Sequence, residues 1–299
     1  MRILFFAMSM VLLTACSSLT EVTVNDKRVE VPRPPMTVEI ANNLFMDKTE
    51  ISNIDYREYL YWITQVYGLE STELEKALPD TTAWRTESVY NEPYVQTYFQ
   101  HPAYSDYPVI GVSYEQATAY AKWRSDRVFE QMLLQKEIID YNTDSNSDNY
   151  FSIKKYYNGE IAGVKPDYTI PYPNYRLPTK AEWEKAAKGL TNDEYGVNIE
   201  KRQTKKAQKQ NWKLFNIKYE NNEGVDMSIT AQVKSYLEND FGIYNMIGNV
   251  GEMVAEKGIA KGGSWTHSLT ESKISNDLTY EKPASWLGFR NVCEYQYWE

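Results

Sequence analysis

Apolar residues recur at helical spacing in residues 54–67, where Tyr56, Leu60 and Ile63 fall on one face of a helix. Residues 45–53 contain a short apolar run followed by polar residues, which predicts a strand and then a turn. The pattern therefore predicts that a strand, a turn and an amphipathic helix follow one another near the start of the folded domain.

Two further helices are predicted, and each has a capping box at its start. Ser113 is followed three positions later by Gln116, and Thr179 is followed in the same way by Glu182. Apolar residues continue at helical spacing far beyond the first of these boxes. The helix that begins after Thr179 is predicted to end at Gly189, because glycine commonly terminates helices.

The N-terminus has the pattern of a targeting segment. Residues 1–15 begin with a basic residue, continue with an apolar run too short to span a bilayer and end in Leu-Thr-Ala before Cys16. This pattern resembles a bacterial lipobox, which implies that Cys16 is acylated and holds the protein at a membrane. No aspartate follows Cys16 to suggest retention in the inner membrane, so we expect the outer membrane. An ordinary signal peptide or an uncleaved anchor is the alternative.

Residues 16–35 are polar and β-branched and then rich in proline, with VPRPP at residues 31–35. Such a composition disfavours a helix and predicts a stiff, extended tether. The folded domain is then predicted to occupy residues 36–299.

Composition changes this picture in three respects. The chain of 299 residues has 25 Tyr and 8 Trp but only 9 Phe, and rings with a polar tip suit a loop-rich domain better than a helical bundle. The formal net charge of −9 provides no basic field for a phosphate backbone, so nucleic acid binding is not predicted. Cys293, the only thiol besides Cys16, lies in an apolar run and is predicted to be buried and inert.

Six segments along the chain together carry one resemblance. They are residues 49–53 (TEISN), 108–123, 176–184 (RLPTKAEWE), 245–252 (NMIGNVGE), 261–265 (KGGSW) and 288–290 (GFR). In order and spacing they are similar to the formylglycine-generating, sulfatase-modifying-factor family, over about residues 36–298. The resemblance implies an α+β domain, an elaborated C-type-lectin-like fold with short strands and much irregular structure.

In that family two reactive cysteines follow the Gly-Gly-Ser strand, bind copper and carry the oxidation. The matching positions of this chain hold His267 and Ser272. The thiolate pair is absent, so we expect no copper cofactor, no catalytic residues and a probable pseudoenzyme. A divergent enzyme of the same family with altered chemistry is the alternative, and a surface lectin is a third interpretation that rests on fold analogy alone.

The family also binds structural calcium, through hard oxygen donors at two sites. The residues that match the first site are Asn245, Gly248, Val250 and Glu252. The residues that match the second site are Asn216, Ile217, Asp226 and Ser228. At the first site the alternative is a turn without a cation, held by the hydrogen bonds of the asparagine and the glutamate.

Ser264 and His267 are close enough in sequence to suggest a hydrolytic nucleophile and its base. The spacing supplies no acid to orient the imidazole and no oxyanion donors, so hydrolysis is not predicted. His101 is the only other histidine, which disfavours a transition-metal site at His267. Arg290 is predicted to be buried in an ion pair or a carbonyl clamp that holds the terminal strand.

Four shorter stretches narrow the resemblance. They are residues 78–81 (LPDT), 90–94 (YNEPY), 101–104 (HPAY) and 123–128 (WRSDRV). They look like the gliding-motility lipoproteins of the type IX secretion system, the GldK/PorK and GldJ group. This resemblance implies a non-catalytic scaffold whose partners are periplasmic secretion proteins of the GldN/PorN kind or related lipoproteins.

In the same group of lipoproteins, the helix that corresponds to the one after Ser113 is longer. Residues 129–173 are accordingly predicted to form an insertion with a polar surface loop at residues 142–149. Phe129 and Met132 on the lengthened helix could face a partner together with residues 78–127, as an apolar anchor cluster. The alternative is that the insertion folds back and covers the helix internally.

Overall fold

The computed structural model describes residues 18–85, 90–191, 194–196, 214–218, 229–236 and 238–299. The helices are α1 (Asn53–Tyr67), α2 (Thr72–Ala77), α3 (Glu92–Thr97), α4 (Tyr114–Gln135), α5 (Ile153–Tyr157) and α6 (Lys180–Lys188), with 3-10 turns η1 (Thr81–Trp84) and η2 (Pro102–Tyr104). The strands are β1 (Leu19–Val24), β2 (Lys27–Pro32), β3 (Thr37–Ala41), β4 (Leu44–Asp47), β5 (Tyr172–Arg176), β6 (Gly251–Met253), β7 (Ile259–Lys261), β8 (Leu278–Thr279), β9 (Leu287–Gly288) and β10 (Val292–Gln296). The predicted α+β class, with short strands and much irregular chain, is confirmed.

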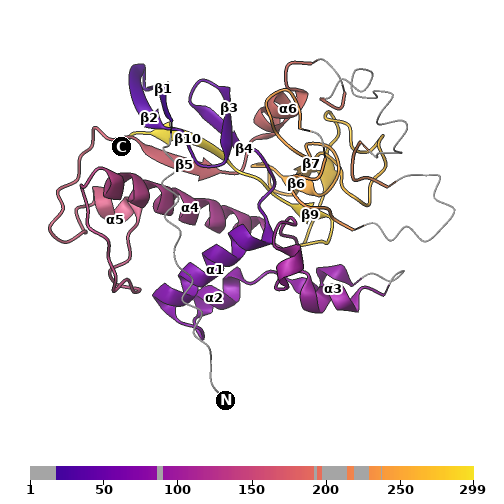
Figure 1. Ribbon diagram of the computed structural model, residues 1–299, viewed down its shortest axis with the longest axis horizontal. Helices are drawn as coiled ribbons and strands as arrows, with labels where there is room; N and C mark the ends of the chain where they lie inside the picture. Colours follow the sequence, from indigo (N-terminus) through magenta and orange to yellow (C-terminus); the bar gives the residue numbers. More distant parts are fainter. Residues whose placement is uncertain (1–17, 86–89, 192–193, 197–213, 219–228, 237) are drawn as a thin grey trace.

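Two sheets and one hairpin organise the described residues (Figure 1). The first sheet has the order β3-β4-β10-β5, and all its neighbours are antiparallel. The second has the order β8-β7-β6-β9, in which β6 and β9 run parallel. Helix α4 lies against β5 and also contacts α1 and α5. Among the described residues, no helix is both long and apolar enough to cross a membrane.

The predicted helices form where their caps indicate. Ser52 caps α1 and Ser113 caps α4, each with a reciprocal capping box. Thr179 forms the same box with Glu182 at α6, which ends at Gly189 as predicted. Each box satisfies backbone N–H groups that the first turn of a helix leaves without partners.

The segment predicted as an extended tether is instead structured over most of its length. Strands β1 and β2 form an antiparallel hairpin whose valines Val22, Val24 and Val31 are buried in the core. The turn between them contains Asn25 and Asp26, both with positive φ, as tight hairpin turns require. Alternation of β-branched and polar residues on either side of an Asn-Asp turn explains why this stretch pairs with itself.

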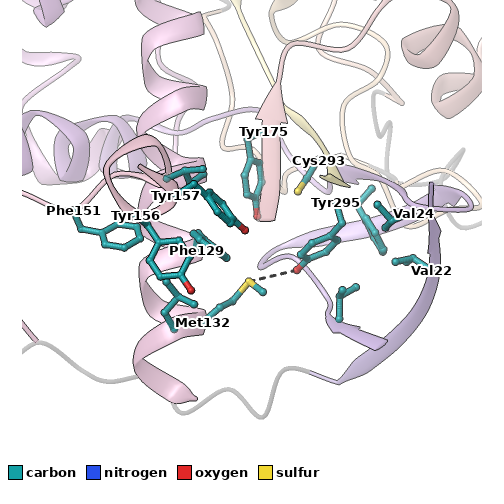
Figure 2. Close-up of a cluster of buried hydrophobic side chains, with 14 of the residues drawn as sticks. Val22, Val24, Phe129, Met132, Phe151, Tyr156, Tyr157, Tyr175, Cys293 and Tyr295 are labelled. Atoms are coloured by element: carbon teal, nitrogen blue, oxygen red, sulfur yellow. Dashed lines mark hydrogen bonds between the residues drawn. The ribbon is translucent and has the colours of Figure 1, made fainter. Parts of the chain in front are cut away.

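The lengthened helix is part of the core and does not present an apolar face to solvent. Phe129, Met132 and Leu133 are at most 5% exposed. Figure 2 shows Phe129 among Phe151, Tyr156 and Tyr157 of the insertion. The insertion therefore covers the helix internally, and the prediction of an exposed interface at Phe129 and Met132 is wrong.

Candidate functional site

The three C-terminal motifs converge because short backbone contacts join them. The amide of Gly248 donates to the carbonyl of Gly262 at 2.8 Å, and the amide of Trp265 donates to the carbonyl of Asn249 at 3.0 Å. The parallel pairing of β6 with β9 sets Glu252 opposite Gly288. Residues far apart in sequence thus form one buried polar centre.

Gly248 shows why this centre needs glycine at the turn. Its φ is +81°, and an added Cβ would lie 2.5 Å from the carbonyl oxygen of Asn216. A side chain there would meet both backbone strain and a steric clash. The turn after Asn245 therefore requires glycine at position 248.

A buried ion pair lies at the middle of the polar centre. Arg290 donates from Nε to Glu252 Oε2 at 2.6 Å and from Nη2 to Glu252 Oε1 at 2.5 Å. Its other N–H groups reach the carbonyls of Asp47 and Tyr244. Trp183 Nε1 donates to Glu252 Oε2 at 2.7 Å. The predicted burial of Arg290, with both an ion pair and a carbonyl clamp, is confirmed.

A second carboxyl group, Glu50, lies beside this pair and was not singled out as a site residue from the sequence. Asn249 Nδ2 donates to Glu50 Oε1 at 2.8 Å, and Asn245 Nδ2 donates to Glu50 Oε2 at 3.1 Å. Burial raises the pKa of Glu50 to about 7, the Arg290 cation opposes this rise, and the Glu252 carboxylate adds to it. Glu252 therefore pairs directly with the guanidinium, whereas Glu50 interacts with it only through its electrostatic field.

The first calcium set does not fit a cation as the residues are placed. Both oxygens of Glu252 are occupied by Arg290 and Trp183, and a cation there would lie against a guanidinium. Asn245 Oδ1 is buried without a partner, which is the one feature that suits a ligand. Among the four predicted ligands Glu252 is the only carboxylate, so the amide oxygen of Asn245 and the carbonyls of Gly248 and Val250 are left without the predicted carboxylate ligand that calcium prefers.

The second calcium set is only partly described. Asn216 Nδ2 donates to the carbonyl of Ile229 at 2.8 Å and to Asn249 Oδ1 at 3.2 Å. The side chain of Ile217 packs in the core. Asp226 and Ser228 lie outside the described residues, as does Cys16 at the N-terminus. Among the described residues, no group of three or more His, Cys, Asp or Glu side chains could hold a metal ion.

The positions that match the reactive cysteines are both occupied by internal contacts. Ser272 is fully buried, and its Oγ donates to the carbonyl of Ser268 at 2.8 Å. An added Cβ at Gly263 would lie 1.8 Å from Ser272 Oγ, so the Gly-Gly strand packs directly on this serine. His267 Nδ1 lies 2.6 Å from Ser264 Oγ.

The Ser264 and His267 pair does not have the arrangement of a hydrolase. Ser264 is 0% exposed, and its Oγ also accepts from the amide of Thr266. No carboxylate hydrogen-bonds to His267 within the described part of the chain. Burial lowers the pKa of His267, which favours the neutral ring. These contacts hold Ser264, Thr266 and His267 together in a local turn.

Lys261, next to the Gly-Gly pair, is a charged residue whose burial the sequence did not reveal. It is 0% exposed, and its Nζ lies 2.8 Å from Glu184 and 3.0 Å from Asp277. Glu184 of α6 therefore neutralises a buried cation. Cys293 is buried as predicted, and burial raises the pKa of its thiol well above the usual value.

The polar centre lies in a part of the chain that matches a known protein family. The family described as sulfatase-modifying factor enzyme 1-like domain matches residues 7–295. The chain belongs to this family. No curated protein matches the sequence.

Three solved structures are similar to the chain. Variable protein 1 of Treponema denticola is 18% identical, covers 92% of this chain and 99% of its own, and has a TM-score of 0.43. CarF is 20% identical, with coverages of 84% and 86% and a TM-score of 0.48. PvdO from Pseudomonas aeruginosa is 15% identical, with coverages of 93% and 91% and a TM-score of 0.48. At these identities and TM-scores, the three carry no argument about the activity of this chain.

Proposed function

We propose that this protein is a non-catalytic member of its family, an outer-membrane lipoprotein that serves as a protein-binding scaffold in type IX secretion and gliding motility. The observation that carries the proposal is the occupation of the two cysteine positions. His267 and Ser272 stand where the family has its thiols, and Ser272 packs under Gly263.

Oxidation on copper needs soft thiolate ligands. A serine hydroxyl is a hard donor that stays protonated at neutral pH, and the hydroxyl of Ser272 is already bound to a backbone carbonyl. His267 offers one imidazole, whose Nδ1 contacts Ser264. The described residues at these positions therefore favour a scaffold over a divergent oxidase.

We expect no formylglycine product from the purified chain. A sulfatase peptide that contains the substrate cysteine, supplied with copper and oxygen, should give no aldehyde above a heat-denatured blank, because the thiolate pair is absent. An active formylglycine-generating enzyme serves as the positive control under the same conditions. Catalytic aldehyde formation would contradict the scaffold proposal and favour the divergent enzyme.

Membrane attachment is proposed to depend on Cys16 alone. Cys16→Ser should move the mature protein from the membrane fraction to the soluble fraction, or leave the precursor uncleaved, because the acyl chains supply the binding energy. Cys293→Ala is the matched control: it removes the other thiol of the chain and should leave fractionation unchanged. Normal processing and retention of the Cys16→Ser protein would refute the lipid anchor.

The proposed partners are periplasmic secretion proteins of the GldN/PorN kind or related lipoproteins. Support comes from the likeness of residues 78–128 to gliding lipoproteins. The lengthened helix is no longer part of the proposed contact surface, because its apolar residues are buried. Within that segment Leu78 is 49% exposed and Tyr90 is 83% exposed. Because large apolar side chains anchor interfaces, these two are the proposed contact residues. Tyr98, in the same segment, is 2% exposed and is therefore not proposed as a contact residue.

A further inference from the structure

A cleft lies where the C-terminal residues meet the two turns of the N-terminal strands. Its volume is about 510 Å³, and it is lined by Asn25, Asn43 and residues 294–299, among others. The C-terminus lies next to the β1–β2 hairpin (Figure 1), away from strands β6 to β9 that carry the family motifs. A concavity of this size is in the range of small-molecule sites.

Side-chain amides in the cleft are held in fixed positions by their own hydrogen bonds. Asn43 Oδ1 accepts from the amide of Tyr295, and Asn43 Nδ2 donates to the carbonyl of Tyr295, both at 2.9 Å. Gln296 Nε2 donates to Glu294 Oε1 at 2.9 Å, and Gln296 Oε1 accepts from the Tyr172 hydroxyl at 3.2 Å. Each amide keeps a further N–H and a further lone pair for a ligand, and fixed groups lose little entropy on binding.

An aromatic ring adds an apolar surface to these polar groups. Trp298 stacks on Tyr157 with ring centroids 5.1 Å apart and an interplanar angle of 11°. Tyr172 meets Trp298 nearly edge on, at 6.2 Å and 60°. Trp298 also belongs to the lining of the cleft. An indole ring that is stacked on a second ring suits the C–H face of a ring-shaped ligand.

The charge of the cleft disfavours anionic ligands. None of the residues that line it is Lys, Arg or His, while Glu294 and Glu299 both belong to the lining. Glu294 is paired with Arg176 at 3.1 Å, which leaves Glu299 as the main source of repulsion for a phosphate or carboxylate ligand. The fixed amides offer both donors and acceptors, which suits an uncharged ligand that carries both kinds of group.

We infer that this cleft binds an uncharged, N-acetylated oligosaccharide. Sugar hydroxyls exchange donor and acceptor pairs with the fixed amides of Asn43 and Gln296, and an acetamido group pairs reciprocally with the exposed side-chain amide of Asn25. The C–H face of one sugar ring lies on Trp298. This site uses no residue of the family motifs and does not depend on the proposed partners.

Calorimetric titration of the detergent-solubilised full chain with the tetramer of N-acetylglucosamine tests the inference. We expect saturable binding of one tetramer per chain, weakened about tenfold or more by Trp298→Ala and measurably by Asn25→Gly. Tyr61→Ala, an exposed aromatic on α1, is the matched control and should bind as the wild type does. Melting curves of each variant establish that it is folded, and Asn25→Gly removes the side-chain amide while allowing the positive φ that the turn requires.

Tetragalacturonate and tetralysine serve as anionic and cationic probes of the same length. We expect no binding of the anion and, at most, weak binding of the cation through Glu294 and Glu299. The inference is overturned by absence of saturable N-acetylglucosamine binding, by equal binding in both cleft variants and the wild type, or by tighter binding of tetralysine.

Discussion

Arg290→Met is expected to lower the free energy of unfolding by about 3–5 kcal/mol, the usual cost of breaking a buried ion pair. The variant keeps an unbranched side chain of similar reach but cannot donate hydrogen bonds. Among the described residues, Trp183 would be the one side-chain donor left to the buried Glu252, and the carbonyls of Asp47 and Tyr244 would lose the donor that Arg290 supplies. A buried charge without its partner is more costly than the loss of the contact itself.

Urea unfolding followed by tryptophan fluorescence measures this loss. Arg85→Met is the matched control, because Arg85 pairs with Glu92 at 2.8 Å on the surface and its loss should be far smaller. Adding Glu252→Gln to Arg290→Met should recover part of the stability, since the orphaned charge is then removed. If both arginine variants lose equal stability, the Arg290–Glu252 ion pair contributes no more to stability than an exposed ion pair does.

The effect of Arg290→Met should also depend on pH. Burial raises the pKa of Glu50 above its unfolded value of 4.5, so its contribution to stability is greatest at low pH and is lost as pH rises through about 7. Arg290 opposes that rise, so its removal raises the pKa of Glu50 further. The difference between variant and wild type should therefore be larger at pH 8 than at pH 5.5.

Local signals in the sequence predict much of the fold. Capping boxes at Ser113 and Thr179 place two helix starts, because they are satisfied by residues three positions away. The glycines of the C-terminal motifs place the turns of the polar centre, since a side chain at Gly248 would clash with backbone. Such features depend on neighbours in sequence or on one close contact.

The pairing of strands and the burial of helix faces were harder to predict, because they depend on residues that are distant in sequence. The hairpin of residues 19–32 was interpreted as a tether because of its proline-rich end, although its valines alternate with polar residues. Whether the lengthened helix is exposed depends on where residues 151–157 fold, which no local pattern of α4 reveals. Burial of a helix face is a tertiary property.

The polar centre shows the same limit. The motif TEISN places Glu50 in a polar stretch, directly before Ile51, and no local pattern there indicates that its carboxyl group is buried. Its partners, Asn245 and Asn249, lie about two hundred residues away. Assigning Glu252 to calcium followed the family pattern, whereas the structure gives both its oxygens to Trp183 and Arg290.

Phe129→Ala is expected to lower the free energy of unfolding by about 3–5 kcal/mol, as for other buried aromatic side chains replaced by alanine. Phe129 is 0% exposed and stacks on Tyr157 at 5.7 Å, with Tyr156 edge on at 5.5 Å (Figure 2). Removal of the ring leaves a cavity between α4 and α5, and the two tyrosines lose their ring contacts with it.

Gln131→Ala, two residues along the same helix, is the matched control. Gln131 is exposed, so its replacement should change stability by no more than about 0.5 kcal/mol. Urea unfolding of both variants distinguishes the two interpretations of the lengthened helix, because an interface residue would tolerate alanine in the isolated protein. A Phe129→Ala protein as stable as the wild type would indicate that this face of α4 is exposed to solvent. The expected loss of stability would indicate that the insertion packs on α4 as part of the core.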